Sequence, residues 1–184
     1  MRRKIVAIIG DANIGEDSAK YKVAYEIGKA LIDNGYRIQS GGLSGIMEAV
    51  FIGAKASEKY KEGDTVAIIP SYNMADANAY ADIVVPTGMD VHRNGIVVNA
   101  DAVIAIGGGV GTLSEMAFAW SNYRLLIGVT SVEGWSKKLA GDKMDYRNRY
   151  DFDDDKVYGA DTAEDVIRIL AENLPRYNKV RKMQ

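Results

Sequence analysis

The sequence of 184 residues contains no cysteine and one histidine, His92. Without thiols the chain has no disulfide, no thiolate nucleophile and no cysteine-ligated zinc site. A single imidazole also excludes a metal site built from several histidines, and a Ser–His relay would depend on this one ring. We therefore expect no resident metal ion.

The chain also lacks a charge excess and a long hydrophobic run. Its 23 basic and 25 acidic residues give a net charge of -2, which predicts no nucleic-acid or membrane partner. No apolar stretch reaches the length of a membrane-spanning helix. The basic start at residues 1–4 and the apolar residues 5–9 resemble a signal peptide, but Gly10 and Asp11 interrupt the run. A first β-strand and a cytoplasmic protein are the better interpretation.

Hydrophobic residues make up 47% of the chain, enough for a sizeable core in one domain over residues 1–184. Short β-branched runs alternate with segments of helical period. Strands are expected at residues 5–9, 36–39, 65–69, 83–85, 102–106 and 125–130, and helices at 18–34, 43–60, 91–99, 112–123 and 162–173. This alternation predicts an α/β fold of three layers, a doubly wound, mainly parallel Rossmann-like sheet with helices on both faces.

The pattern is lost between residues 135 and 158, where Asp151, Asp153, Asp154 and Asp155 gather. Clustered carboxylates can bind a divalent cation. The spacing of a calcium loop with its central glycine is absent, so a solvated loop is the preferred interpretation. The basic segment at residues 176–182 is interpreted as a frayed end rather than an anion site.

Three glycine-rich turns follow predicted strands, at residues 10–15, 40–45 and 107–112. Ligands of doubly wound proteins bind at this edge of the sheet. Glycine lets the backbone approach an anion, and a helix start offers unpaired N–H groups. The predicted phosphate-binding residues in these turns are Gly10, Gly41, Gly42, Gly45, Gly108, Gly109, Gly111 and Thr112.

The absence of certain motif residues excludes several classes of ligand. A dinucleotide fingerprint needs glycine or alanine where Thr112 stands and an acidic residue after the second strand, which ends in Ser40 instead. No Gly-Lys-Ser/Thr follows any of the turns, which excludes P-loop nucleotide hydrolases. No lysine lies in the turns to form a Schiff base, which argues against a pyridoxal phosphate decarboxylase. A mononucleotide or a pterin phosphate fits better, and no cofactor is required.

Thr112 and Glu115 have two interpretations. Thr-x-x-Glu is the spacing of a helix capping box. Alternatively, Glu115 is an acid, base or charge stabiliser beside a bound sugar phosphate. Arg93 is a candidate fork for phosphate or carboxylate, against the simpler reading of a surface arginine. Its neighbour His92 is interpreted as a loop residue rather than a catalyst.

Residues 107–115, GGGVGTLSE, resemble the PGGxGTxxE motif of the "lonely guy" cytokinin-activating family, long mislabelled as lysine decarboxylases. Residues 41–47, GGLSGIM, resemble the family's GGGxxGLM signature, and residues 87–94 stand where the family has an Arg-Lys pair. The resemblance covers residues 5 to about 130 and implies a Rossmann-like, usually dimeric protein that releases the base from a nucleoside 5′-monophosphate. It further implies that Gly108, Gly109, Gly111 and Thr112 bind phosphate, that Arg93 contacts the nucleotide and that Glu115 is catalytic.

The sequence departs from this pattern at three positions. Gly107 replaces the motif's proline, Asn94 its lysine and Ser40 its first glycine. The forms TGMxxxRN and GGxxGIMEAV are more similar to the branch that contains the molybdenum cofactor carrier proteins. Two functions follow: a binding protein for a nucleotide or a molybdopterin-type ligand, or a nucleoside monophosphate phosphoribohydrolase that uses Glu115 and Arg93.

The helices expected at residues 43–60 and 112–123 are apolar on more than one face. Such helices need either a thick core or a partner chain. A homodimer or higher homo-oligomer is therefore expected, although a helix buried within the domain would show the same pattern.

Overall fold

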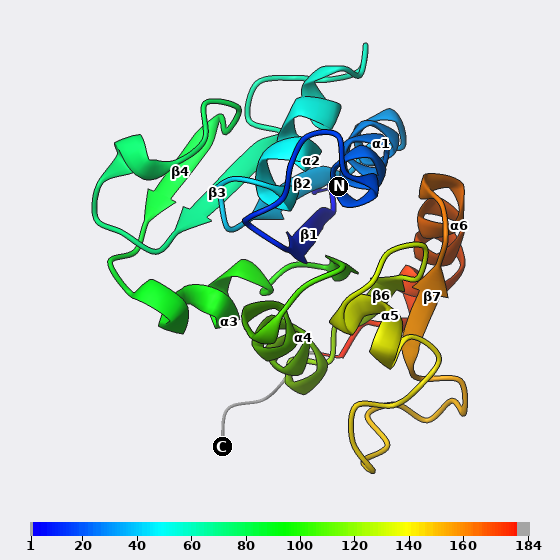
Figure 1. The fold of residues 1–184 in the computed structure, drawn as a ribbon. Coiled ribbons are helices and arrows are strands. Elements are labelled where there is room, and N and C mark those ends of the chain that lie inside the picture. Colours follow the sequence, from blue (N-terminus) through cyan, green and yellow to red (C-terminus); the bar gives the residue numbers. More distant parts are fainter. Residues whose placement is uncertain (1, 180–184) are drawn as a thin grey trace.

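The structure is a computed structural model, and it describes residues 2–179. Within these residues the sheet has seven parallel strands in the order β4-β3-β2-β1-β5-β6-β7 (Figure 1). The strands are β1 (Ile5–Gly10), β2 (Arg37–Ser40), β3 (Thr65–Ile69), β4 (Ile83–Pro86), β5 (Ala102–Ile106), β6 (Leu125–Val129) and β7 (Val157–Ala160). The strand order reverses direction at β1, whose neighbours are β2 and β5. The doubly wound α/β prediction is confirmed.

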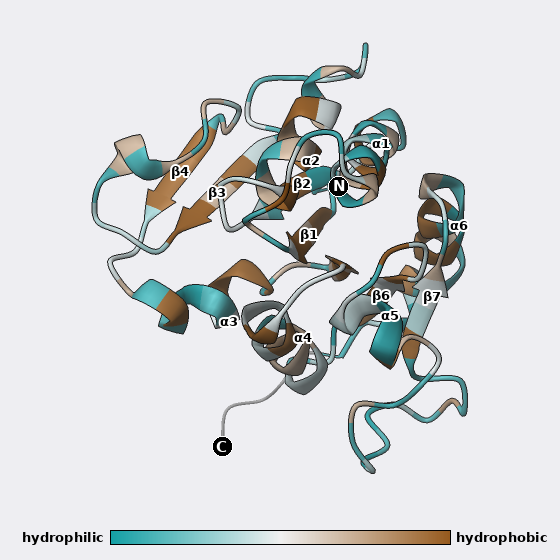
Figure 2. Cartoon of the chain, viewed as in Figure 1, coloured by the Kyte–Doolittle hydropathy of each residue, from teal (hydrophilic) through white to brown (hydrophobic). Residues whose placement is uncertain are grey.

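Helices cover both faces of this sheet. They are α1 (Ala19–Asp33), α2 (Ile46–Lys55), α3 (Asn94–Val97), α4 (Val110–Ser121), α5 (Trp135–Leu139) and α6 (Ala163–Asn173), with 3-10 turns η1 (Met74–Asp76), η2 (Asp90–Arg93) and η3 (Leu174–Arg176). One buried cluster joins α1, α2 and α6 to the sheet, and a second joins α3, α4 and α5 to the opposite face. In Figure 2 most of β3 and β4 is hydrophobic, whereas α1 carries many hydrophilic residues.

Helix α1 has the ends that its sequence predicts. The Ser18 side chain accepts a hydrogen bond from the Tyr21 N–H at 3.2 Å, and Gly35 follows the helix with a φ of +82°. Its Gly28 lies so close to α2 that a Cβ there would clash with the carbonyl oxygen of Val50. Helix α2 is thus enclosed between α1 and the sheet, which accounts for its apolar faces within the chain.

Three helices differ in their bounds from the prediction, and α2 also ends at Lys55 rather than at about residue 60. Helix α2 begins at Ile46, because Gly42 and Gly45 both have a positive φ and residues 43–45 form a turn. The segment expected as one helix over residues 91–99 is divided between η2 and the single turn α3. Helix α4 begins at Val110, two residues before the expected start, with Gly109 as its N-cap.

The prediction of a solvated loop at residues 135–158 was wrong in part, because α5 and the edge strand β7 lie there. Asp155 is buried, accepts a hydrogen bond from Arg149 at 2.6 Å and another from the Tyr177 hydroxyl at 2.8 Å. Asp151 and Asp153 are exposed. Among residues 2–179 no group of three or more histidine, aspartate or glutamate side chains is arranged to hold a metal ion.

The C-terminal segment was predicted to fray from residue 176. Tyr177 is instead buried, with its ring 4.8 Å from that of Tyr150, and the Lys179 ammonium lies 5.1 Å from the Tyr150 ring centroid. The rest of the predicted frayed end, residues 180–182, lies outside the described residues. No helix in the described part of the chain is both long and apolar enough to cross a membrane.

Candidate functional site

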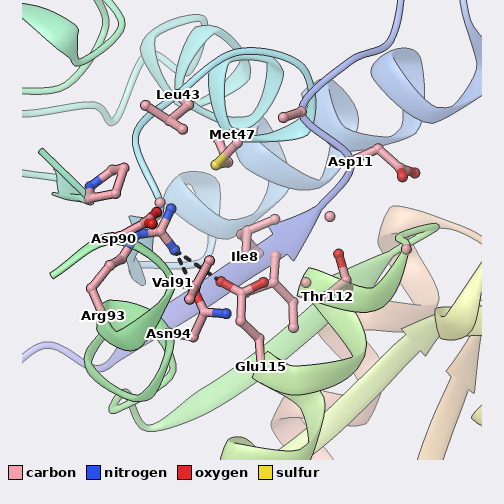
Figure 3. Close-up of a pocket in the computed structure, with 17 residues that line it drawn as sticks. Ile8, Asp11, Leu43, Met47, Asp90, Val91, Arg93, Asn94, Thr112 and Glu115 are labelled. Carbon is pink, nitrogen blue, oxygen red and sulfur yellow. Dashed lines mark hydrogen bonds and ion pairs between the residues drawn. The ribbon is translucent and has the colours of Figure 1, made fainter.

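A cavity of about 340 Å³ opens at the carboxyl ends of β1, β2, β3 and β5 (Figure 3). This is the edge where the strand order reverses at β1, the usual ligand position in doubly wound sheets. The lining residues are Ile8, Ile9, Gly10, Asp11, Ala12, Gly41, Leu43, Met47, Pro70, Asp90, Val91, Arg93, Asn94, Gly109, Gly111, Thr112 and Glu115. The cavity therefore joins all three glycine-rich turns to the η2–α3 segment.

The N-terminus of α4 forms one wall of the cavity. Gly107 and Gly108 turn the chain with φ values of +64° and +94°, and α4 starts at Val110 without a side-chain cap. The first N–H groups of a helix have no partner within it. No hydrogen bond among the described residues takes the N–H groups of Val110, Gly111 and Thr112. A Cβ at Gly109 or Gly111 would meet nothing within 4 Å, so an anion has room to approach.

The capping-box interpretation of Thr112 and Glu115 was wrong. Because α4 begins at Val110, Thr112 is already its third residue and Glu115 lies in its second turn. The Glu115 carboxylate is buried and accepts a hydrogen bond from Arg93 Nη1 at 3.3 Å, across 22 positions of sequence. Glu115 therefore faces the cavity rather than the start of its own helix.

Burial dominates the electrostatics of this ion pair. It raises the pKa of Glu115 to about 7, although the charge and hydrogen bond of Arg93 act in the opposite direction. Burial also lowers the pKa of Arg93, with Glu115 opposing it. A single contact at 3.3 Å does not replace the water that each charged group loses. Near neutral pH, Glu115 can thus hold or release a proton at the cavity wall.

A chain of polar contacts fixes Arg93 against α4. Arg93 Nη1 donates to Asn94 Oδ1 at 3.0 Å, Asn94 Nδ2 donates to Ser114 Oγ at 2.8 Å, and Ser114 Oγ donates to the Gly111 carbonyl at 2.7 Å. The Nε atom of Arg93 is buried and has no hydrogen-bond partner among the described residues. Its Nη2 atom packs on Gly41, where a Cβ would lie 2.7 Å away. Only Nη1 donates to other described residues, so the guanidinium keeps donors that none of these residues accepts.

The structure brings most of the predicted site residues to the cavity. Arg93, Glu115 and Thr112 line it, as do the glycines at positions 10, 41, 109 and 111. The glycines at 42, 45 and 108 do not line it: their tight neighbours are side chains of β3, the backbone of residues 11–12 and the Thr112 side chain, respectively. His92 is exposed and outside the cavity.

Sequence reasoning missed several residues of the site. Asp90, Val91 and Met47 line the cavity, and Ser114 anchors the polar chain. Asp90 has a φ of +48°, which is unusual for a residue other than glycine. In the sequence, only the closeness of Asp90 and Val91 to Arg93 could have indicated that they line the cavity, because residues next to each other in a turn often line the same cavity.

The fold and this cavity define a Rossmann-like α/β protein with a cavity at its topological switch point. More specifically, the chain belongs to the SLOG cluster4 family, whose model matches residues 3–166. This agrees with the resemblance to the lonely-guy family and its molybdenum cofactor carrier branch.

Three known proteins are similar to this chain. An uncharacterized protein of Archaeoglobus fulgidus is 39% identical over 120 residues, which cover 65% of this chain and 75% of the relative. The X-ray structure of TM1055, a structural genomics target, has a TM-score of 0.78 at 26% identity and covers 92% of this chain and 99% of its own. The molybdenum cofactor binding protein of the phototrophic bacterium Rippkaea orientalis has a TM-score of 0.74 at 28% identity, with 94% and 98% covered.

Proposed function

We propose that this protein binds a small phosphate-bearing ligand, a nucleoside monophosphate or a molybdopterin-type cofactor, in the cavity at the N-terminus of α4. The observation that carries the proposal is a pairing of two anion-seeking features in one cavity. One is the row of unpartnered N–H groups at residues 110–112, and the other is Arg93, buried with its Nε atom unpaired. Each is suited to an anion, and a phosphate can use both.

The size and the walls of the cavity support a ligand with a flat ring. Its volume of about 340 Å³ lies within the range of small-molecule sites. Ile8, Leu43, Met47 and Val91 supply apolar surface between the two polar ends (Figure 3). The R. orientalis relative, named as a molybdenum cofactor binding protein, supports the pterin form of this ligand class.

In this proposal the polar groups of the chain divide the work of binding. The α4 N–H groups hold phosphate oxygens, and Arg93 contacts a second anionic or carbonyl group. Asn94, which also lines the cavity, and Ser114 act as positioning residues, because their hydrogen bonds hold Arg93 against α4. A bound molybdenum cofactor would bring its own redox chemistry, for which the protein supplies binding and orientation.

The test begins with mass spectrometry of small molecules released from the denatured, purified protein, followed by calorimetric titration with AMP and adenosine. Arg93→Met should weaken AMP binding by about tenfold or more, the loss expected for a charged hydrogen-bond partner. Arg168→Met, which changes an exposed arginine of α6, is the matched control. Equal AMP affinity in the Arg93 variant and the unaltered protein would contradict the proposal.

The raised pKa of Glu115 supports a second candidate, the phosphoribohydrolase. A carboxyl group with a pKa of about 7 at the cavity wall can donate a proton to a leaving base. Incubation with AMP should then release adenine, and Glu115→Ala should abolish the release. If AMP binds and no adenine is released, the phosphoribohydrolase is excluded and only the binding function remains.

A further inference from the structure

A carboxylate of the protein itself already occupies an anion position at the glycine-rich turn. The Gly108 N–H donates to Asp11 Oδ2 at 2.8 Å, and Lys20 Nζ donates to the same oxygen at 2.6 Å. Asp11 follows β1, Lys20 lies in the first turn of α1, and Gly108 is 97 positions from Asp11. The turn therefore binds the Asp11 carboxylate, which is paired with the Lys20 ammonium, and the sequence analysis assigned neither side chain to the site.

Gly107 provides the space for this ion pair. A Cβ at this position would lie 2.6 Å from Asp11 Oδ2 and 2.8 Å from Lys20 Cε. The family motif has proline here, whose ring restricts φ to about -65°, whereas Gly107 has a φ of +64°. The departure from the motif and the Asp11–Lys20 pair are thus two parts of one local arrangement.

The turn itself is fixed from its other side. The Gly107 N–H donates to Ser136 Oγ at 2.9 Å, and the Ser136 N–H donates to the Gly107 carbonyl at 3.0 Å. The side chains of Asp11 and Lys20 are about one quarter exposed. If another anion replaced the Asp11 carboxylate at the turn, the side chains of Asp11 and Lys20 would move and the backbone of the turn would stay in place.

The cavity has too few cationic groups to neutralise a bound phosphate monoester. Asp11, Asp90 and Glu115 line it together with one basic residue, Arg93. A phosphate monoester carries nearly two negative charges at neutral pH. In Figure 3 Asp11 and Thr112 lie on one side of the cavity and Arg93 on the other, so Arg93 does not supply a cation on the side of Asp11 and Thr112.

We propose that Lys20 is an anion-binding residue of this site and that the Asp11 carboxylate competes with a ligand phosphate for Lys20 and the Gly108 N–H. This inference rests on the proposed function and specifies its ligand as one with a terminal phosphate monoester. Lys20 and Gly108 are outside the lining of the cavity, and both contact Asp11, which lines it. When the phosphate takes the place of the Asp11 carboxylate, it gains these two partners, while Arg93 faces the ligand from the opposite side of the cavity.

The experiment is calorimetric titration with inorganic phosphate, AMP and adenosine. Lys20→Met should weaken phosphate and AMP binding by about fivefold, and Asp11→Asn should strengthen both by a similar factor, the size expected for a partly exposed charge pair. Adenosine binding should stay unchanged in both variants. Asparagine retains an acceptor for the Gly108 N–H, so the turn keeps its hydrogen bond. Lys22→Met and Asp17→Asn change exposed neighbours and serve as controls.

The outcomes separate this inference from the proposed function. An unchanged phosphate affinity in Lys20→Met, or a weaker one in Asp11→Asn, would overturn the inference even if Arg93→Met still weakens AMP binding. Binding of both phosphate and AMP by Asp11→Asn, with neither bound by the unaltered protein, would support the competition and refute the proposed function. Absence of binding by both proteins would overturn the two together. Amide NMR shifts of Gly108 during the titration locate the binding at the turn.

Discussion

The ionisation of Glu115 predicts an unusual pH dependence of stability. An ordinary glutamate has a pKa of 4.5, and burial raises that of Glu115 to about 7 in the folded protein. Between these two values the folded protein retains a proton that the unfolded chain has already lost. Stability contributed by the protonated carboxyl is therefore complete below about pH 4.5 and is lost as the pH rises to about 7.

The magnitude follows from the width of this window. Each pH unit corresponds to about 1.4 kcal/mol, so the free energy of unfolding falls by about 3 kcal/mol from this group alone. Glu115→Gln keeps the size of the side chain but cannot ionise, so it should remove this slope. The variant also loses the charged partner of Arg93, which lowers its free energy of unfolding at every pH. This loss does not restore the dependence of the unfolding free energy on pH.

The assay is urea denaturation followed by tryptophan fluorescence at half-unit steps from pH 4.5 to 8. The difference in unfolding free energy between Glu115→Gln and the unaltered protein should change by about 3 kcal/mol across this range, in favour of the variant at high pH. Glu26→Gln, an exposed change in α1, should follow the unaltered protein. Asp82, whose pKa is lowered to about 2 by its hydrogen bonds to Tyr60 and Lys55 against its burial, titrates below this range. Parallel curves for Glu115→Gln and the unaltered protein would refute the reasoning.

Two further substitutions test the packing that supports the site. Gly28→Ala should lower the free energy of unfolding by about 2 kcal/mol, because its Cβ would clash with the Val50 carbonyl and force α1 from α2; a more stable variant in urea denaturation would contradict the close packing, since alanine favours helix. Asp155→Asn should cost about 3 kcal/mol or more, because it leaves Arg149 buried without its anionic partner. Asp151→Asn, an exposed change, is the control, and equal losses at both positions would argue against a structural role for the buried pair.

Most of the sheet could be predicted because its strands have a local signature. The expected bounds of β3 and β5 match the structure, since each is a short, continuous apolar run between polar turns. The prediction failed at α5 and β7, which have five and four residues. Elements this short take their stability from contacts: Ser136 of α5 bonds to Gly107, and β7 pairs only with β6 among the described residues.

Which residues line the cavity could be predicted in part for the same reason, and the rest could not for a different one. Glycine-rich turns after strands are visible in the sequence. Arg93 and Glu115 were candidates from their residue types and positions, and the resemblance of motifs implied the same roles. Their ion pair, the raised pKa of Glu115 and the role of Gly41 in making room for Arg93 all depend on how β2, η2 and α4 pack. From spacing alone, a capping box and a role of Glu115 in the cavity were equally good interpretations. Only the position of Gly109 as the N-cap of α4 decided against the capping box.

By itself, the sequence determined the layers of the fold and the edge at which a ligand can bind, because hydrophobic period and the positions of glycine are local properties. Tertiary structure alone decided which charged groups meet at that edge. Asp11 joins Gly108 across 97 positions, and Glu115 joins Arg93 across 22, because parallel strands deliver distant turns to one place. Charge at the cavity therefore depends on three-dimensional proximity and burial, and no local pattern in the chain encodes either.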